Sequence, residues 1–276
     1  NFFTGGTYGF TSIGNLGEAS SLGAPTGVAE GTVVVQAGGG LGGTLIYTGS
    51  GNASNRGFRF VNTSSGSNQL RNSGSGTLKL SGDIATTNAF NLGMSFNAVT
   101  ADFELTGTIS SASARTIGFV GSAGRTIVVN GDNTYSGPTS IGTITVKADS
   151  LTNTGTTSSF GTGIDGGINM AAGTLRYTGG ATTSDRALTV DGSNVFANDG
   201  TGGLDFSGAT NFATGGNGTD SLTLGGTYGG TNTFSGILAG TGSLVADGTG
   251  TWVLGGANTF AGTTTVGRYF KRQGYR

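Results

Sequence analysis

Residues 43–57 of this 276-residue chain read GTLIYTGSGNASNRG, and residues 173–186 read GTLRYTGGATTSDR. Two further stretches recur in the same way: NSGSGTLKLSG (72–82) returns as NDGTGGLDFSG (198–208), and RTIVVNGDNTYSGPTSI (125–141) returns as GTWVLGGANTFAGTTTV (250–266). The offset drifts from 130 to 125 residues, so the copies differ by insertions in loops. A stacked solenoid tolerates such insertions because each turn contacts only its neighbours. We therefore expect a single solenoid over 1–267, with copies at about 1–132 and 133–267.

Within each copy the local pattern has a period of two. Runs of three to five residues rich in Val, Ile, Leu, Phe and Thr are bounded by Gly, Asn, Asp or Ser, as is typical of short strands between tight turns. No segment has the apolar spacing of an amphipathic helix, so we predict no helix. A sandwich, a propeller and a parallel β-helix all fit short strands. The 58 glycines and the lack of two-residue hairpin signals favour the β-helix, with about 11–13 coils at roughly 20–25 residues each.

Residues that recur at equivalent positions are expected to form the framework of the repeat. An N-x-[FY]-x-G element begins at Asn1, Asn133 and Asn258, and SSLG at 20–23 returns as SSFG at 158–161. The predicted framework residues are Asn133, Tyr135, Asn258, Phe260, Tyr47, Tyr177, Arg56 and Arg186. We expect the arginines to donate hydrogen bonds to carbonyl groups of the next coil and the tyrosines to be half-buried. The alternative is that these side chains form a glycan-binding row.

The stretch from Trp252 to Val266 (WVLGGANTFAGTTTV) resembles the autotransporter-associated, or passenger-associated, β-strand repeat, as do GDNTYSGPTSI at 131–141 and GTLRYTG at 173–179. The pattern of that family is close to L-x-L-x-G-x-N-T-[FY]-x-G-x-T-x-[IV], and the resemblance covers essentially the whole chain through its long copies. It implies a right-handed parallel β-helix from a large secreted protein of the bacterial surface. It implies little about a specific activity.

Composition excludes several classes of function. The chain has no Cys and no His, so it has no disulfides, no thiol or imidazole metal site, and no catalysis that depends on His. Its net charge of -1 argues against binding to nucleic acid. No stretch approaches the roughly 18 apolar residues of a membrane span. The chain begins at Asn1 without a signal peptide, so we expect a processed or trimmed product that is extracellular or at the bacterial cell surface.

Two candidate sites carry carboxylates. GGNGTDSLT at 215–223 matches a calcium-binding nonapeptide, with the Asp220 carboxylate as the ligand, although an ordinary glycine-rich turn explains it too. We expect no other cofactor. Asp102 and Glu104 lie on one face of a predicted strand, as a glycosidase or lyase would need. Their counterparts in the second copy are taken to be Ser221 and Thr223, so the pair is no part of the framework, and we expect no enzyme.

The two ends of the chain suggest assembly. Residues 268–276 leave the repeat pattern as a basic aromatic tail, and residues 1–10 are aromatic and already in repeat register. Solenoid ends normally need polar caps, because they expose unpaired strand edges. We therefore expect head-to-tail stacking of identical chains. The predicted assembly residues are Phe2, Phe3, Tyr8, Phe10, Arg268, Tyr269, Phe270, Lys271, Arg272 and Tyr275.

The leading functional interpretation is an extracellular structural subunit of a bacterial surface fibre or filament, assembled head to tail. The alternative is an autotransporter-type adhesin passenger fragment that binds glycans or matrix. A third is a carbohydrate-active β-helix enzyme. The expected partners are further copies of the chain and, for an adhesin, glycans or other surface proteins, with neither nucleic acid nor a direct membrane span.

Overall fold

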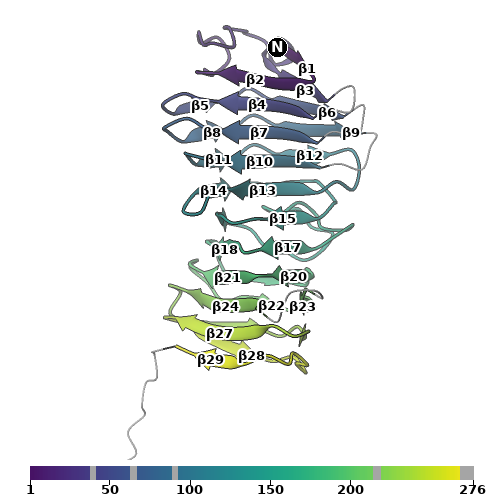
Figure 1. The fold of residues 1–276 in the computed structure, drawn as a ribbon, viewed down its shortest axis with the longest axis vertical. Coiled ribbons are helices and arrows are strands. Elements are labelled where there is room, and N and C mark those ends of the chain that lie inside the picture. Colours follow the sequence, from purple (N-terminus) through teal and green to yellow (C-terminus); the bar gives the residue numbers. More distant parts are fainter. Residues whose placement is uncertain (38–41, 63–66, 89–92, 214–218, 268–276) are drawn as a thin grey trace, which may run out of the picture.

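The computed structural model describes residues 1–37, 42–62, 67–88, 93–213 and 219–267. Its short strands lie above one another as rungs of one elongated stack, from the N-terminal coil at one end to β29 at the other (Figure 1). Neighbouring strands pair in parallel, with residues of one coil in register with those of the next. The chain is therefore an all-β solenoid of parallel strands, as the repeats predict.

In the described part of the chain the strands form four sheets, named S1 to S4. Sheet S1 contains, in order, β1 (Phe2–Thr4), β3 (Val33–Ala37), β6 (Phe58–Asn62), β9 (Ile84–Asn88) and β12 (Ile109–Ser111). Sheet S2 contains β2 (Gly6–Phe10), β4 (Gly43–Tyr47), β7 (Asn68–Asn72), β10 (Met94–Ala98), β13 (Ile117–Gly121), β15 (Thr139–Ile141), β17 (Ile168–Ala171), β20 (Leu188–Asp191), β23 (Thr210–Phe212) and β26 (Leu238–Ala239). Sheet S3 contains β5 (Asn52–Ser54), β8 (Leu78–Leu80), β11 (Phe103–Leu105), β14 (Thr126–Val129), β16 (Thr145–Ala148), β18 (Thr174–Tyr177), β21 (Ser193–Asn198), β24 (Ser221–Gly226), β27 (Ser243–Gly248) and β29 (Thr264–Val266). Sheet S4 contains β19 (Thr182–Ser184), β22 (Leu204–Phe206), β25 (Thr231–Phe234) and β28 (Thr251–Leu254).

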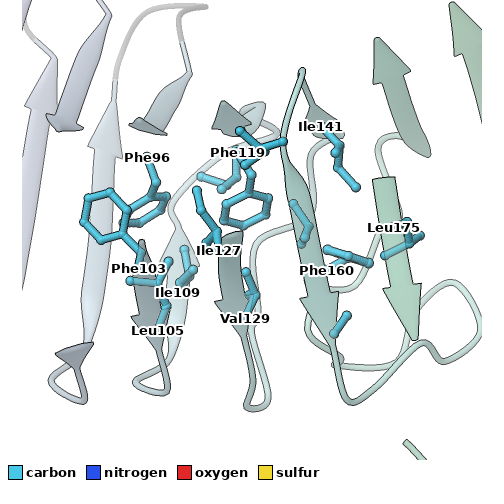
Figure 2. Packing of buried hydrophobic residues seen from close by; sticks show 14 of the residues in the cluster. Phe96, Phe103, Leu105, Ile109, Phe119, Ile127, Val129, Ile141, Phe160 and Leu175 are labelled. Carbon is cyan, nitrogen blue, oxygen red and sulfur yellow. The ribbon is translucent and has the colours of Figure 1, made fainter. Parts of the chain in front are cut away.

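The core is a continuous apolar column inside the stack. In β10 the buried Met94, Phe96 and Ala98 alternate with half-buried polar residues, because successive side chains of a strand point to opposite faces. Parallel register places Phe96 beside Phe119 of the next coil, where the two rings stack with their centroids 5.8 Å apart (Figure 2). Each coil therefore fills the space that the coils above and below leave open.

Two equivalent glycines allow the coils to approach closely. A Cβ on Gly82 would collide with the backbone of Arg56, and a Cβ on Gly208 would collide with the backbone of Arg186. The final glycine of the L-x-L-x-G pattern is thus required by space, since any side chain would push two coils apart.

Coil length varies more than the sequence suggests. Gly6 pairs with Gly43, which makes a coil of 37 residues, whereas Ile168 pairs with Leu188, which makes one of 20 residues. The two long sheets contain ten strands each in the described residues, fewer than the coils predicted from an even spacing. The excess residues lie in two long loops, at 11–32 and 149–167. The first contains a single helical turn, α1 (Val28–Gly31), so the prediction of no helix is wrong at this turn.

The second copy is turned by one face of the rod relative to the first. Coils of the first copy run through S1, S2 and S3, as β6, β7 and β8 do, whereas coils of the second copy run through S2, S3 and S4, as β20, β21 and β22 do. The sequence repeat matches Leu78 with Leu204, and these residues begin β8 of S3 and β22 of S4. Each strand of the second copy therefore lies in the sheet that follows, along the chain, the sheet of its equivalent strand in the first copy. S1 and S4 both follow S3 and precede S2, so they cover the same third side at different heights.

The N-x-[FY]-x-G segments explain this turn. The Asn133 Oδ1 accepts a hydrogen bond from the Ile109 N–H (2.6 Å), which stacks the segment that begins at Asn133 on β12, the last strand of S1. The Asn258 Oδ1 accepts one from the Leu238 N–H (2.9 Å), which stacks the next segment on β26, the last strand of S2. The stretch from Asn133 to Asn258 thus consists of whole coils plus one further side, so the segment at Asn258 begins one face later than the segment at Asn133.

The same correspondence corrects the sequence alignment of the acidic pair. Asp102 precedes β11 and Glu104 lies within it. The equivalent strand in the second copy is β25, so the counterparts of the two acids are Thr231 and Thr233. The sequence alignment matches them with Ser221 and Thr223. Glu104 forms an ion pair with Lys79 of the preceding coil, at 2.7 Å between Oε2 and Nζ. The pair is absent from the second copy under either alignment.

Candidate functional site

The long loops at 11–32 and 149–167 are equivalent parts of the two copies, and we call them the first and second clamped loop. Each contains one SSxG element and follows an equivalent strand, β2 in the first copy and β16 in the second. Each is bound by an arginine from the coil that follows it. The two loops are therefore one structural device, which occurs twice on different sides of the rod.

Arg56 binds the first clamped loop. Its Nε donates to the Gly31 carbonyl (2.7 Å) and its Nη1 to the Leu22 carbonyl (3.0 Å), while Nη2 donates to the Asn1 Oδ1 (2.6 Å). The side chain is 1% exposed, and burial lowers the pKa of its guanidinium from the ordinary value. An arginine guanidinium is not deprotonated in proteins, so all of its N–H groups remain donors.

Arg186 binds the second clamped loop with more bonds. Its Nε donates to the Thr152 carbonyl (2.9 Å), its Nη1 to the Phe160 carbonyl (2.8 Å) and its Nη2 to the Gly161 carbonyl (2.6 Å). Burial lowers the pKa of this guanidinium, an effect opposed by the neighbouring Tyr135 and Asp185. Both arginines donate to carbonyl groups as the sequence predicts, but the coil they bind is the preceding one rather than the next.

A second set of bonds repeats around the two arginines. The Leu16 N–H donates to the Asn55 Oδ1 (2.9 Å), and the equivalent Thr154 N–H donates to the Asp185 Oδ1 (2.6 Å). The residue before each arginine thus holds the loop backbone as well. Because both bonds recur at equivalent residues, the clamp is a property of the repeat rather than of one loop.

The recurring tyrosines lie inside the rod, so the prediction that they are half-buried is wrong. Tyr47 and Tyr177 are 0% and 3% exposed, and each hydroxyl is hydrogen-bonded, to the Asn52 Oδ1 (3.0 Å) and to the Gly180 carbonyl (2.6 Å) respectively. Tyr135 is buried too and shares a hydrogen bond with the Thr139 hydroxyl (2.8 Å), and burial raises its pKa above the usual range. Phe260 is partly buried against the core, with its ring centroid 6.2 Å from that of Phe212. The buried rings of Tyr47, Tyr135 and Tyr177 therefore cannot act as a sugar platform in this fold.

The residues predicted for assembly are in different environments. Phe2 is 60% exposed and Tyr8 is 37% exposed, while Phe3 is partly buried against the core and packs against Tyr8 with the two rings tilted. Phe10 is buried and packs on Tyr47, so it cannot contact another chain. The predicted tail residues, from Arg268 to Tyr275, lie outside the described residues.

Asp220 is buried at the start of β24. Its Oδ1 accepts a hydrogen bond from the Gly192 N–H (2.8 Å), and its Oδ2 has no hydrogen-bond partner. Residues 214–218, which would complete the predicted calcium loop, lie outside the described residues. Across the described ranges no three His, Cys, Asp or Glu side chains gather as metal ligands would. Calcium at Asp220 therefore stays a prediction.

A shallow groove opens on the outer face of S4. It has a volume of about 630 Å³ and is lined by Ala181, Thr182, Thr183, Gly203, Leu204, Asp205, Thr231 and Thr233. These residues come from β19, β22, β25 and the turns before them, so the groove runs from coil to coil along the rod. Sequence reasoning missed it, because its lining residues come from three separate segments of the chain that meet only when β19, β22 and β25 stack.

Asp199 predicts a dependence of stability on pH. Burial raises the pKa of this carboxyl. Hydrogen bonds from Arg176 (2.6 Å) and Thr227 lower the pKa by more than burial raises it, so the pKa lies below its ordinary value. The stabilisation is present above the unfolded pKa of about 3.9 and is lost as the pH falls through the folded pKa. We expect Asp199→Asn to lower the free energy of unfolding by about 1 kcal/mol at pH 7 and by less below pH 4.

Urea denaturation at pH 7, 5 and 3 checks this expectation. Asp191→Asn, which changes an exposed carboxylate, serves as the control and should leave the unfolding free energy nearly unchanged at each pH. A difference between wild type and Asp199→Asn that stays constant down to pH 3 would contradict the assignment.

Comparison with known proteins gives one informative similarity. No protein-family model matches the chain, and no solved structure matches it. The chain is 45% identical over 272 residues to the adhesin BmaC autotransporter of Brucella suis biovar 1 (strain 1330). The match covers 95% of this chain but only 8% of that protein, so the chain spans a small part of the relative's length.

Location follows from the same similarity. In the described residues no helix has the length and hydropathy needed to cross a membrane. An autotransporter adhesin acts at the cell surface, and the match covers 95% of this chain. The chain is thus a β-solenoid, extracellular or at the bacterial cell surface, that is similar over nearly all of its length to one stretch of an autotransporter adhesin.

Proposed function

We propose that the chain is a passenger segment of an autotransporter-type adhesin and works there as a stiff, non-enzymatic rod. The observation that supports this most is the 45% identity to such an adhesin over 95% of the chain. The fold fits the role, because a passenger must present a binding surface away from the cell. Ten rungs at about 4.8 Å each give this segment a length of roughly 45 Å.

The stiffness of the rod has two sources in the proposal. Parallel backbone ladders run along its length, and the aromatic and aliphatic side chains of neighbouring coils interlock inside it. The clamped loops fill a side that lacks a strand, and Arg56 and Arg186 hold them in place. Glu104, one of the two carboxylates predicted on one face of a strand, is engaged by Lys79 in an ion pair.

A second candidate is a filament subunit that stacks head to tail. It is favoured by the apolar side chains exposed on both terminal coils, with Phe2 and Val266 each 60% exposed. Another copy of the chain would bury them, and so would further coils of one longer polypeptide. The similarity to a much longer adhesin favours burial by further coils of one longer polypeptide over burial by another copy.

Two measurements test the proposal. Negative-stain electron microscopy of the purified chain, with and without calcium, should show short separate rods, whereas long uniform filaments would support the second candidate. Beads coated with the folded chain should attach to cultured epithelial cells several-fold more than beads coated with the heat-unfolded chain. Equal attachment would count against a direct adhesive role for this segment.

A further inference from the structure

The groove on S4 differs from the equivalent surface of the first copy. The outward positions of β22 and β25 hold Asp205 and Thr233, which are neighbours in register. The equivalent positions of β8 and β11 hold Lys79 and Glu104, joined by an ion pair of 2.7 Å. The first copy therefore covers this surface with a paired cation and anion, whereas the second leaves a carboxylate beside hydroxyl groups.

Asp205 is poised to accept further hydrogen bonds. Its Oδ1 accepts one from the Ser235 hydroxyl at 2.6 Å, and it is in none of the ion pairs of the described residues. An ionised carboxylate offers about four acceptor positions. The residue is half-buried and lines the groove.

The remaining lining residues determine which ligand fits. Thr182, Thr183, Thr231 and Thr233 offer hydroxyl groups that donate and accept, and no Lys or Arg lines the groove. A hydroxyl-rich neutral molecule can satisfy this surface, while an anionic one would be repelled by Asp205. Gly203 keeps the floor open, and the Tyr228 hydroxyl lies 4.0 Å from the point where a Gly203 side chain would begin.

The direction of the groove favours a chain over a single sugar. It crosses three successive coils, whose strands repeat at about 4.8 Å, a spacing comparable to the length of one pyranose residue. A linear ligand that lies along the rod can therefore meet equivalent side chains in successive coils.

We propose that the S4 groove binds a linear neutral polysaccharide, with Asp205 accepting hydrogen bonds from its hydroxyl groups and Thr183 and Thr233 contacting adjacent sugar residues. This inference rests on the proposed adhesin function and names the ligand class for one surface of it. The first copy, where Lys79 and Glu104 neutralise each other, has no such site at its equivalent surface.

Isothermal titration calorimetry of the whole chain tests the proposal with three linear neutral hexasaccharides: a β-1,4-glucan, a β-1,4-mannan and a β-1,4-galactan. A hyaluronan hexasaccharide serves as the anionic comparison. We expect at least one neutral hexasaccharide to bind and hyaluronan not to bind. Asp205→Asn should weaken that binding by about tenfold or more, because a hydrogen bond to a charged acceptor is lost. Thr233→Val should weaken it by a smaller factor.

The matched control is Asp191→Asn, an exposed carboxylate on S2, which should leave affinity unchanged. The proposal is overturned if no neutral hexasaccharide binds, if hyaluronan binds more tightly, or if Asp205→Asn binds as well as wild type. Bead attachment separates this from the proposed function. Wild-type beads that attach while the hexasaccharides fail to bind leave the adhesin standing and remove the groove as its site.

Discussion

Replacing Arg186 by Met is expected to lower the free energy of unfolding of the second copy by about 3–5 kcal/mol. Met keeps most of the volume but removes every donor, so the Phe160 carbonyl loses its partner inside the rod and the Thr152 and Gly161 carbonyls each lose one of their hydrogen bonds. A buried carbonyl left unpaired costs about 1–3 kcal/mol, and hydrogen bonds to a charged donor are stronger than neutral ones. Arg186→Lys should recover only part of the loss, because an ammonium cannot reproduce the planar fork.

Urea denaturation combined with amide hydrogen exchange measures this effect. The loss of protection should be concentrated in residues 149–167, since a solenoid transmits strain mainly to adjacent coils. Arg59→Met, at an exposed position of β6, is the matched control and should change stability by less than about 0.5 kcal/mol. Equal effects of the two variants would show that the clamp does not hold the loop.

Phe196→Ala should be similarly severe, at about 3–5 kcal/mol, because it removes a large buried ring. Phe196 is fully buried, and its ring centroid lies 5.3 Å from that of Phe206, 6.4 Å from that of Phe234 and 6.0 Å from that of Trp252. The cavity would touch three strands of S4 and one of S3, so the coils cannot close over it without moving.

The position of the damage is as informative as its size. Hydrogen exchange should accelerate in the coils from β20 to β28 and stay slow from β4 to β11, because the core of a solenoid is linked only through neighbouring coils. Phe2→Ala, at a 60% exposed position, is the control. Uniform acceleration over the whole chain would indicate one cooperative unit instead.

The sequence was sufficient to predict the class of fold and the recurring contacts. Strand runs between glycines, together with two copies of one long pattern, indicate stacked parallel coils, and the recurrence of Arg56 and Arg186 indicates bonds to neighbouring backbone. Recurrence works as a signal here because a residue needed by the framework must return in each copy. It also explains why Asp205 and Thr233 were missed: they depart from the framework, and they meet only when β22 and β25 stack.

The turn between the copies could not be predicted. A sequence offset of 125–130 residues does not reveal how many coils it contains, because coil length varies from 19 to 37 residues. Only the pairing of Asn133 with β12 and of Asn258 with β26 shows that a copy ends one side later than it began. In a chain with more such copies, successive clamped loops would follow one another around the rod.

Cysteine cross-linking across the junction of the copies tests the account most directly, and the chain contains no Cys of its own. Val128 of β14 pairs with Lys147 of β16, so the double variant Val128→Cys, Lys147→Cys should form a disulfide under mild oxidation. Adjacent parallel strands lie about 4.8 Å apart, within the range that a disulfide spans.

If each copy consisted of whole coils only, β16 would instead lie on β13, beside Val120. Rapid cross-linking of the 128–147 pair, with none in Val120→Cys, Lys147→Cys, is the predicted result. The reverse pattern would contradict the one-face turn and the solenoid register on which the groove and the clamps depend.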